Sequence, residues 1–142
     1  MCGRYQRQYE PILYGWKQGA DHYWCGDRDQ GDVWFFDKPA KNDLHPTMKP
    51  VALVERAIRN SSKSRDIVLD PFGGSGTTLI AAERTGRRAR LIELDPKYAD
   101  VIVQRWQEQT ERTAILERSG QSFGEVSPKS SDCNLADPRV SR

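Results

Sequence analysis

The chain has 142 residues, a formal net charge of +2 at pH 7 and 30% charged residues. This length allows one domain, and a net charge so close to zero gives no argument for or against a nucleic-acid partner. No apolar run approaches the length of a membrane span and the N-terminus lacks an apolar signal core, so we expect a cytoplasmic protein with no membrane partner.

The cysteines and histidines are too few and too far apart to suggest a metal site. Cys2, Cys25 and Cys133 include no C-x-x-C pair, and His22 and His45 are the only histidines. An odd number of widely spaced cysteines also gives no disulfide framework. We therefore expect reduced thiols and no bound metal.

The first part of the chain predicts β structure. Residues 10–17 form an apolar run typical of a buried strand, and nothing before them covers it, so we expect the chain to begin inside a domain. Two aromatic runs, at residues 21–26 and 33–36, flank a polar turn and favour a hairpin. Four of their rings could stack on an extruded base: Tyr23, Trp24, Trp34 and Phe35. Packing against a sheet is the favoured alternative, because aromatic side chains commonly fill cores.

A linker and an extended segment come next. Residues 38–44 have the composition of a linker, and residues 45–50 read His-Pro-Thr-Met-Lys-Pro. The two prolines keep that backbone extended, which exposes its polar groups to a ligand; alternatively, the segment is only a rigid entry to the following helix. Apolar residues at spacings of three and four predict a helix over residues 51–59. Its inward residues would be Leu53, Val54, Ala57 and Ile58.

The centre of the chain predicts a strand, a tight loop and a helix. The β-branched run at residues 67–70 ends in a carboxylate and leads into the sequence Pro-Phe-Gly-Gly-Ser-Gly at residues 71–76. A helical pattern over residues 77–85 stops at Gly86, which is typical of a helix C-terminus. Such a loop gathers backbone N–H groups around a crevice where α/β sheets bind ligands.

A second strand and a helix follow this unit. Residues 91–94 predict the strand, and Pro96 predicts the start of the helix. An apolar stripe along this helix predicts core residues: Tyr98, Val101, Ile102, Arg105 and Trp106. From residue 116 onward the composition is typical of a disordered tail.

Three types of glycine-rich loop compete for residues 71–76. A P-loop requires Lys after its last glycine, whereas Gly76 is followed by two threonines, so a P-loop is excluded. A dinucleotide site would place a pyrophosphate at this loop, where the carboxylate of Asp70 would repel it. An acid there suits a ligand with an ammonium group, and Glu93, near the end of the second strand, has the spacing of an acid that binds ribose hydroxyls. Both features fit S-adenosylmethionine (SAM).

Three ordered blocks resemble the cofactor-binding half of DNA amino-methyltransferases that modify the exocyclic amine of adenine or cytosine. The blocks are His-Pro-Thr-Met-Lys-Pro at 45–50, Asp-Pro-Phe-Gly-Gly-Ser-Gly-Thr-Thr at 70–78 and Leu-Ile-Glu-Leu-Asp-Pro-Lys-Tyr at 91–98. Their order resembles the β group of that family, and the likeness extends over roughly residues 9–112. The resemblance implies an α/β fold, a partial Rossmann-like SAM-dependent methyltransferase fold with a sheet flanked by helices and incomplete in the region of the catalytic strand.

The resemblance also implies a domain division and a set of site residues. A partial DNA methylase domain would occupy residues 1–115, with a strand and hairpin region at 9–44 and a cofactor-binding half at 45–112, followed by a disordered tail at 116–142. The cofactor would be SAM, held by Thr47, Lys49, Asp70, Phe72, Gly73, Gly74, Ser75, Gly76, Thr77, Thr78, Glu93 and Asp95. The role of Asp95 stays open between contact with the adenine edge and capping of the helix at Pro96.

The family's methyl-acceptor loop, an Asp-Pro-Pro-Tyr type of sequence, has no counterpart in this chain, which contains no Pro-Pro pair. We therefore expect no catalytic residue here and a fragment or one half of a split DNA methyltransferase. The expected partners are DNA and, for a split enzyme, a separate polypeptide that supplies the catalytic loop. The strand at 67–70 would then expose an edge where a separate chain could add. The alternative is a noncatalytic module that binds SAM and DNA and regulates a full enzyme. The sequence does not distinguish adenine from cytosine as the target.

Overall fold

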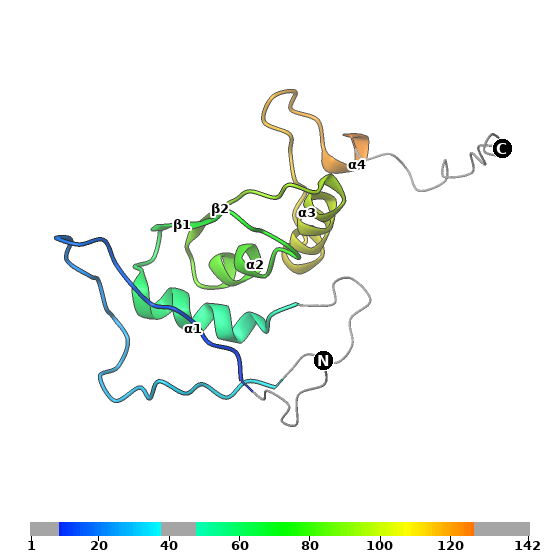
Figure 1. Cartoon of the computed structure of the whole chain (residues 1–142). Helices are drawn as coiled ribbons and strands as arrows, with labels where there is room; N and C mark the ends of the chain where they lie inside the picture. The colour runs from blue at the N-terminus through cyan, green and yellow to red at the C-terminus, as the bar shows by residue number, and fades with distance from the viewer. Residues whose placement is uncertain (1–8, 38–47, 127–142) are drawn as a thin grey trace, which may run out of the picture.

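The structure, a computed structural model, describes residues 9–37 and 48–126 (Figure 1). The elements of this part of the chain are α1 (Val51–Ser61), β1 (Ile67–Asp70), α2 (Thr77–Arg84), β2 (Arg88–Leu91), α3 (Pro96–Thr110) and α4 (Phe123–Val126). None of the helices in the described ranges is both long enough and apolar enough to cross a membrane.

The strands β1 and β2 form a parallel pair joined by α2. The register places Ile67 opposite Arg88 and Asp70 opposite Leu91. Because the strands are parallel, their carboxyl ends lie at the same edge of the sheet, and the loops that follow them meet there. The predicted strand at residues 67–70 and the predicted helix that ends before Gly86 are confirmed.

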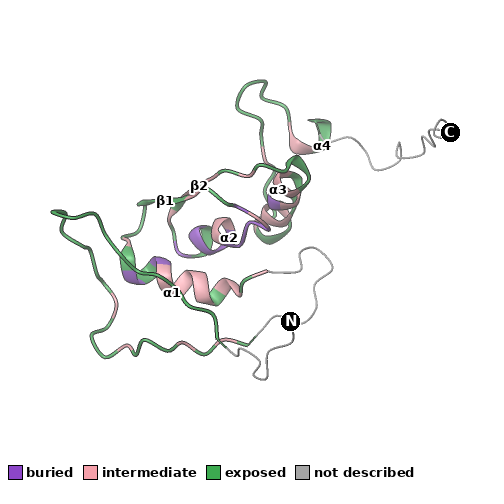
Figure 2. Cartoon of the chain, viewed as in Figure 1, coloured by how far each residue is buried: buried purple, intermediate pink, exposed green. Residues whose placement is uncertain are grey.

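The core lies between this sheet and the two helices α1 and α2. Ile58 of α1 and Ala81 and Ala82 of α2 are buried together, and Val68 of β1 and Ala89 of β2 pack against them. Figure 2 shows the buried positions gathered on α2, on the end of α1 and on the glycine loop. The small alanines let α2 approach the sheet closely, so the start of α2 is held firmly beside the strand ends.

The opposite face of the sheet is uncovered within the described residues. Alternation along β1 directs Ile67 and Leu69 away from the helices, and they remain 57% and 65% exposed. Their partners across the ladder on this face are Arg88 and Arg90, both exposed. Parallel sheets are ordinarily covered on both faces, so this face is unusual for the fold class.

Residues 9–37 contain no helix or strand, which corrects two expectations. The predicted strand at 10–17 is an exposed irregular segment, and the predicted hairpin across 21–36 is absent. A strand requires a hydrogen-bonded neighbour, and in the described residues the sheet consists of β1 and β2 alone. The segment instead lies along α1, where the Cys25 N–H donates to the Asn60 carbonyl at 2.8 Å.

The second strand begins earlier than its apolar pattern predicts. The ladder runs over Arg88–Leu91 instead of residues 91–94, because pairing with β1 starts where the Arg88 N–H donates to the Asp66 carbonyl at 2.9 Å. The arginines of β2 are tolerated because they lie on the uncovered face. Glu93 therefore lies two residues beyond the strand, in the turn before α3.

The C-terminal part of the described chain is ordered further than its composition predicts. Ile115 and Ser122 form an antiparallel bridge, and the short helix α4 follows it. The beginning of the expected disordered tail therefore has a defined turn in residues 116–126. Residues 127–142 lie outside the described part of the chain.

The glycine loop rests directly on α3. A Cβ added to Gly76 would lie 3.0 Å from the side chain of Ile102, and one added to Gly73 would lie 2.9 Å from the same side chain. A Cβ added to Gly74 would have open space, with the Phe72 carbonyl oxygen nearest to it at 3.9 Å. Both Gly74 and Gly76 adopt a positive φ, of 53° and 77° respectively.

These positions predict a difference between two glycine substitutions. Gly74→Ala should lower the free energy of unfolding by roughly 1 to 2 kcal/mol, the cost of a left-handed backbone with a Cβ. Gly76→Ala should add a cost of about 1 to 3 kcal/mol, because the new methyl group also overlaps Ile102. Urea titration followed by circular dichroism measures both values. Equal losses in the two variants would contradict the close contact between the loop and α3.

Candidate functional site

Two carboxylates border the glycine loop. Asp70 is the last residue of β1, and the Ile92 N–H donates to its carbonyl at 2.9 Å, which continues the parallel pairing past β2. The next residue, Glu93, accepts the Gly74 N–H through Oε2 at 2.6 Å. The turn after β2 is thus attached to the loop after β1, and both acids lie at the carboxyl edge of the sheet.

The loop's backbone donors are largely committed to acceptors within the protein. The Phe72 N–H donates to Asp70 Oδ1 at 3.0 Å, and the Gly73 N–H donates to the Ile92 carbonyl at 2.9 Å. The Gly76 N–H closes a turn onto the Gly73 carbonyl at 2.8 Å. An anion-binding loop requires several N–H groups directed at the ligand, and here those of residues 72, 73, 74 and 76 are already bonded.

Glu93 also holds the turn that leads into α3. Its Oε1 accepts the Asp95 N–H at 3.1 Å, and Asp95 Oδ1 accepts the Lys97 N–H at 2.9 Å. Asp95 is therefore the N-cap of α3, with Pro96 at the first position of the helix, as one of the two alternatives for this residue predicts. Contact of Asp95 with an adenine edge stays a prediction.

The entry to α1 meets the loop through backbone and hydroxyl groups. Thr77 Oγ1 donates to the Lys49 carbonyl at 3.4 Å and lies 3.4 Å from Ser75 Oγ. The Lys49 ammonium forms an ion pair with Glu10. Thr47, the other predicted site residue of this segment, lies outside the described residues. The structure therefore places Lys49 beside the loop although the two are far apart in sequence.

The predicted site residues divide into exposed and buried groups. Phe72 is 86% exposed, whereas Ser75 and Thr77 are buried and Thr78 is half-buried. Glu93 and Asp70 are half-buried, which leaves part of each acid accessible. The hydroxyls of Ser75 and Thr77 accordingly hold the loop together, and the acids with Phe72 border its open side.

Two residues of α3 contact the loop although their sequence pattern predicted only core packing. Ile102 fills the space beside Gly73 and Gly76, and the Arg105 guanidinium donates to the carbonyl of Ser75. Burial lowers the pKa of Arg105. The one signal in the sequence is that these residues lie one helical turn apart on a helix that begins just after Glu93.

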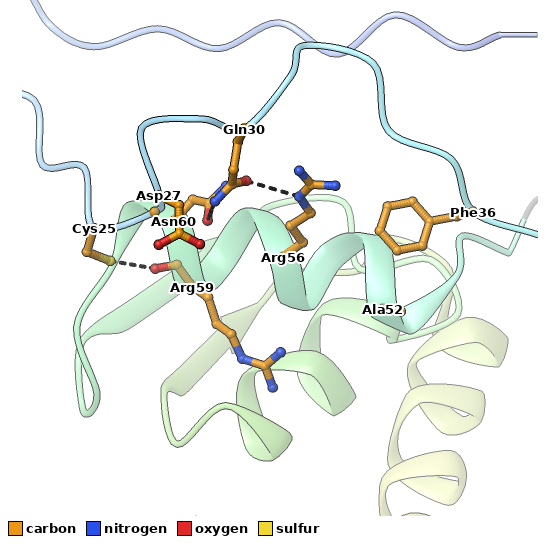
Figure 3. A pocket seen from close by; sticks show the side chains of 9 residues that line it. Cys25, Asp27, Gln30, Phe36, Ala52, Arg56, Arg59 and Asn60 are labelled. Carbon is orange, nitrogen blue, oxygen red and sulfur yellow. Dashed lines mark hydrogen bonds between the residues drawn. The ribbon is translucent and has the colours of Figure 1, made fainter.

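A separate pocket of 440 Å³ lies between α1 and residues 25–36 (Figure 3). Gln30 and Asn60 exchange amide hydrogen bonds of 3.1 and 2.8 Å, and Arg56 Nε donates to Gln30 Oε1 at 3.1 Å. The Arg56 guanidinium also lies 4.4 Å from the centre of the Trp34 ring. No predicted cofactor residue lines this pocket, whose charged lining residues are Asp27, Arg56 and Arg59. These contacts attach residues 25–36 to α1.

Comparisons with known proteins show the family of this chain. The family model N6_N4_Mtase, described as DNA methylase, matches residues 3–104. The type II methyltransferase M2.DpnII of Streptococcus pneumoniae is 35% identical over 124 residues, which cover 78% of this chain and 46% of that protein. The type II methyltransferase M2.LlaDCHI of Lactococcus lactis subsp. cremoris is 40% identical over 118 residues, covering 73% and 44%.

A solved structure shares the fold. The crystal structure of the M1.HpyAVI–SAM complex superposes with a TM-score of 0.57 and 31% identity, covering 63% of this chain and 46% of that one. The expected fold class, α/β and partial Rossmann-like with helices flanking the sheet, is thereby confirmed. The chain spans somewhat less than half the length of these relatives. Because the family model covers most of the chain, this protein belongs to the N6/N4 DNA methylase family.

Proposed function

We propose that the glycine loop, Asp70 and Glu93 bind SAM, and that this chain is the cofactor-binding part of a DNA methyltransferase. The substrate is the exocyclic amine of adenine or cytosine in DNA. The observation that carries the proposal is the hydrogen bond of 2.6 Å from the Gly74 N–H to Glu93. This bond brings Glu93 to the loop that directly follows Asp70. The M1.HpyAVI structure, a SAM complex with the same fold, supports it.

The charge of the site favours a cationic ligand over a phosphate. Two carboxylates border the loop, and most of its N–H groups bond to protein acceptors, so a pyrophosphate would meet repulsion and few donors. The ammonium of a methionine moiety suits Asp70. A carboxylate has about four acceptor positions, so Glu93 can hold the loop and also accept from ribose hydroxyls. SAM combines both groups.

The remaining predicted residues complete the proposed site. Lys49 belongs to the entry of α1 beside the loop, and Phe72 offers an exposed ring at its open side. Thr47, which lies outside the described residues, is included in the proposed site from the resemblance alone. Gly73 and Gly76 let the backbone lie against α3. When bound, SAM supplies the methyl group. The residues of this chain bind and orient SAM, and groups outside this chain bind the target amine.

We propose that a further stretch of polypeptide, carrying an Asp-Pro-Pro-Tyr type of loop, supplies the grip on the target base. The chain has no Pro-Pro pair and spans under half the length of its relatives. Within the described residues, β1 has a strand neighbour on one side only, and Ile67 and Leu69 are exposed on the uncovered face. A parallel strand with a free edge can accept another strand, and its exposed apolar face favours a cover.

Removing either acid should weaken the binding of SAM. We expect Asp70→Ala and Glu93→Ala each to lose roughly 1.5 to 3 kcal/mol of binding free energy, about 10- to 150-fold in affinity, because each removes a charge-assisted contact. Isothermal titration calorimetry measures the change. Asp100→Ala, at an exposed position of α3, is the matched control and should bind as the parent does. Undiminished affinity in both site variants would contradict the assignment.

The chain alone should bind SAM without transferring its methyl group. We expect no labelled methyl group on DNA that contains both adenine and cytosine targets, because this chain has no loop to accept hydrogen bonds from the target amine. Scintillation counting after incubation with labelled SAM measures transfer, and M2.LlaDCHI under the same conditions is the positive control. Methylation of DNA by this chain alone would show that its own residues form the acceptor site.

A further inference from the structure

Ser75 lies at the buried turn of the glycine loop, and its backbone carbonyl has a charged partner. The residue is 6% exposed, and the Arg105 guanidinium of α3 donates to this carbonyl. A buried carbonyl without a partner would cost the free energy of a lost hydrogen bond, so some donor is required here. The structure supplies it from a different element, 30 residues further along the chain.

The peptide group between Ser75 and Gly76 is held at both ends. Its carbonyl accepts from Arg105, and its N–H, which points in the opposite direction within the peptide plane, donates to the Gly73 carbonyl at 2.8 Å. Gly76 has a positive φ and no side chain, so little else restricts rotation of this peptide. Ile102 limits how closely the loop approaches α3, but a methyl group does not determine which way a peptide faces. The two hydrogen bonds of the peptide do, and the one from Arg105 is the one that α3 supplies.

Arg105 forms no ion pair within 4 Å in the part of the chain that the structure describes, although Glu108, about one turn further along α3, attracts it electrostatically. The side chain is half-buried, and loss of hydration lowers the pKa of its guanidinium, which stays protonated because arginine titrates far above neutral pH. A partly desolvated cation whose described partner is a neutral carbonyl forms a strong hydrogen bond but contributes no ion pair. This arrangement fits the holding of a backbone better than the pairing of surface charges.

We propose that Arg105 is a positioning residue for the cofactor loop: its guanidinium fixes the orientation of the Ser75–Gly76 peptide and thereby keeps Gly74 in place for Glu93. Gly74 and Ser75 are the two central residues of the turn closed by Gly73 and Gly76, so a rotation of the Ser75–Gly76 peptide opens that turn. Glu93 would then lose its contact with Gly74. That the loop binds SAM rests on the proposed function, whereas the role of Arg105 in holding the loop does not.

Amide hydrogen exchange of the unliganded protein, followed residue by residue by NMR, tests the positioning role. In Arg105→Met, which keeps an unbranched side chain without the donor, we expect exchange at Gly74 and Gly76 to accelerate by about tenfold or more. Amides of α1 should exchange as in the parent. Arg105→Lys, which keeps a charged donor, should restore part of the protection. Arg118→Met, at an exposed position outside α1, α2 and α3, is the matched control and should leave the loop unchanged.

Affinities for SAM and for S-adenosylhomocysteine provide the second measurement. A positioning role predicts that Arg105→Met lowers the affinity for both ligands by the same factor, about tenfold. The two ligands differ in the charge at their sulfur, and the substitution alters the loop that binds both of them. Loop exchange equal to the parent's would overturn the proposal, as would acceleration spread equally over α1 and α2. If Arg105→Met does not fold, the comparison of Arg105→Lys with the parent decides. If the parent itself binds neither ligand, the proposed function fails, and the loop exchange still decides the role of Arg105.

Discussion

The parallel pairing of β1 with β2 is the interaction on which the rest of the site depends. It brings the carboxyl ends of two strands to one edge, so the loop after β1 and the turn after β2 become neighbours. The Gly74 N–H then reaches Glu93, and the Gly73 N–H reaches the Ile92 carbonyl. Without this register, Asp70 and Glu93 would be two unrelated acids, more than twenty residues apart.

The electrostatic character of the site follows from this pairing. Each acid accepts a loop N–H, so the donors that other glycine-rich loops present to phosphates are directed at carboxylates of the protein. The loop is thereby attached to the protein through its N–H groups and bordered by two negative charges. Its underside is supported by Ile102 and Arg105, which act by contact and by hydrogen bonding respectively. The same six-residue loop thus has a negative open side and a positive support beneath it.

Much of the central unit could be predicted from the sequence, because its signals are local. The run of residues 67–70, the stop at Gly86 and the start at Pro96 each depend on neighbouring residues only, and the structure confirms them. The predicted position of the second strand is wrong by three residues. Apolar content favours residues 91–94, whereas the pairing with β1 places the strand at Arg88–Leu91. The arginines of this strand are accommodated only because one face of the sheet is open, which no local pattern reveals.

Contacts between distant segments were the part that the sequence could not predict. Two aromatic runs that flank a polar turn predict a hairpin across residues 21–36, but a strand forms only with a partner strand, and these residues have none in the described part of the chain. Arg105 was assigned to a core stripe because its spacing is helical; its hydrogen bond to Ser75 depends on how α3 lies against the loop. The sequence identifies Asp70 by its place at the end of a strand and Glu93 by its spacing from the glycine loop, while their bonds to loop amides depend on the folded chain.

The attachment of residues 9–37 to α1 implies two levels of local stability in one chain. This segment has no backbone ladder, and its described links are largely side-chain contacts such as those joining Gln30 to Asn60 and Arg56 to Trp34. The glycine loop is bonded instead through its backbone to β2 and the turn after it, and through α3 to the rest of the core. Detachment of the leading segment therefore requires less free energy than opening of the loop, and the leading segment would be cut first by a protease while the cofactor end keeps its shape.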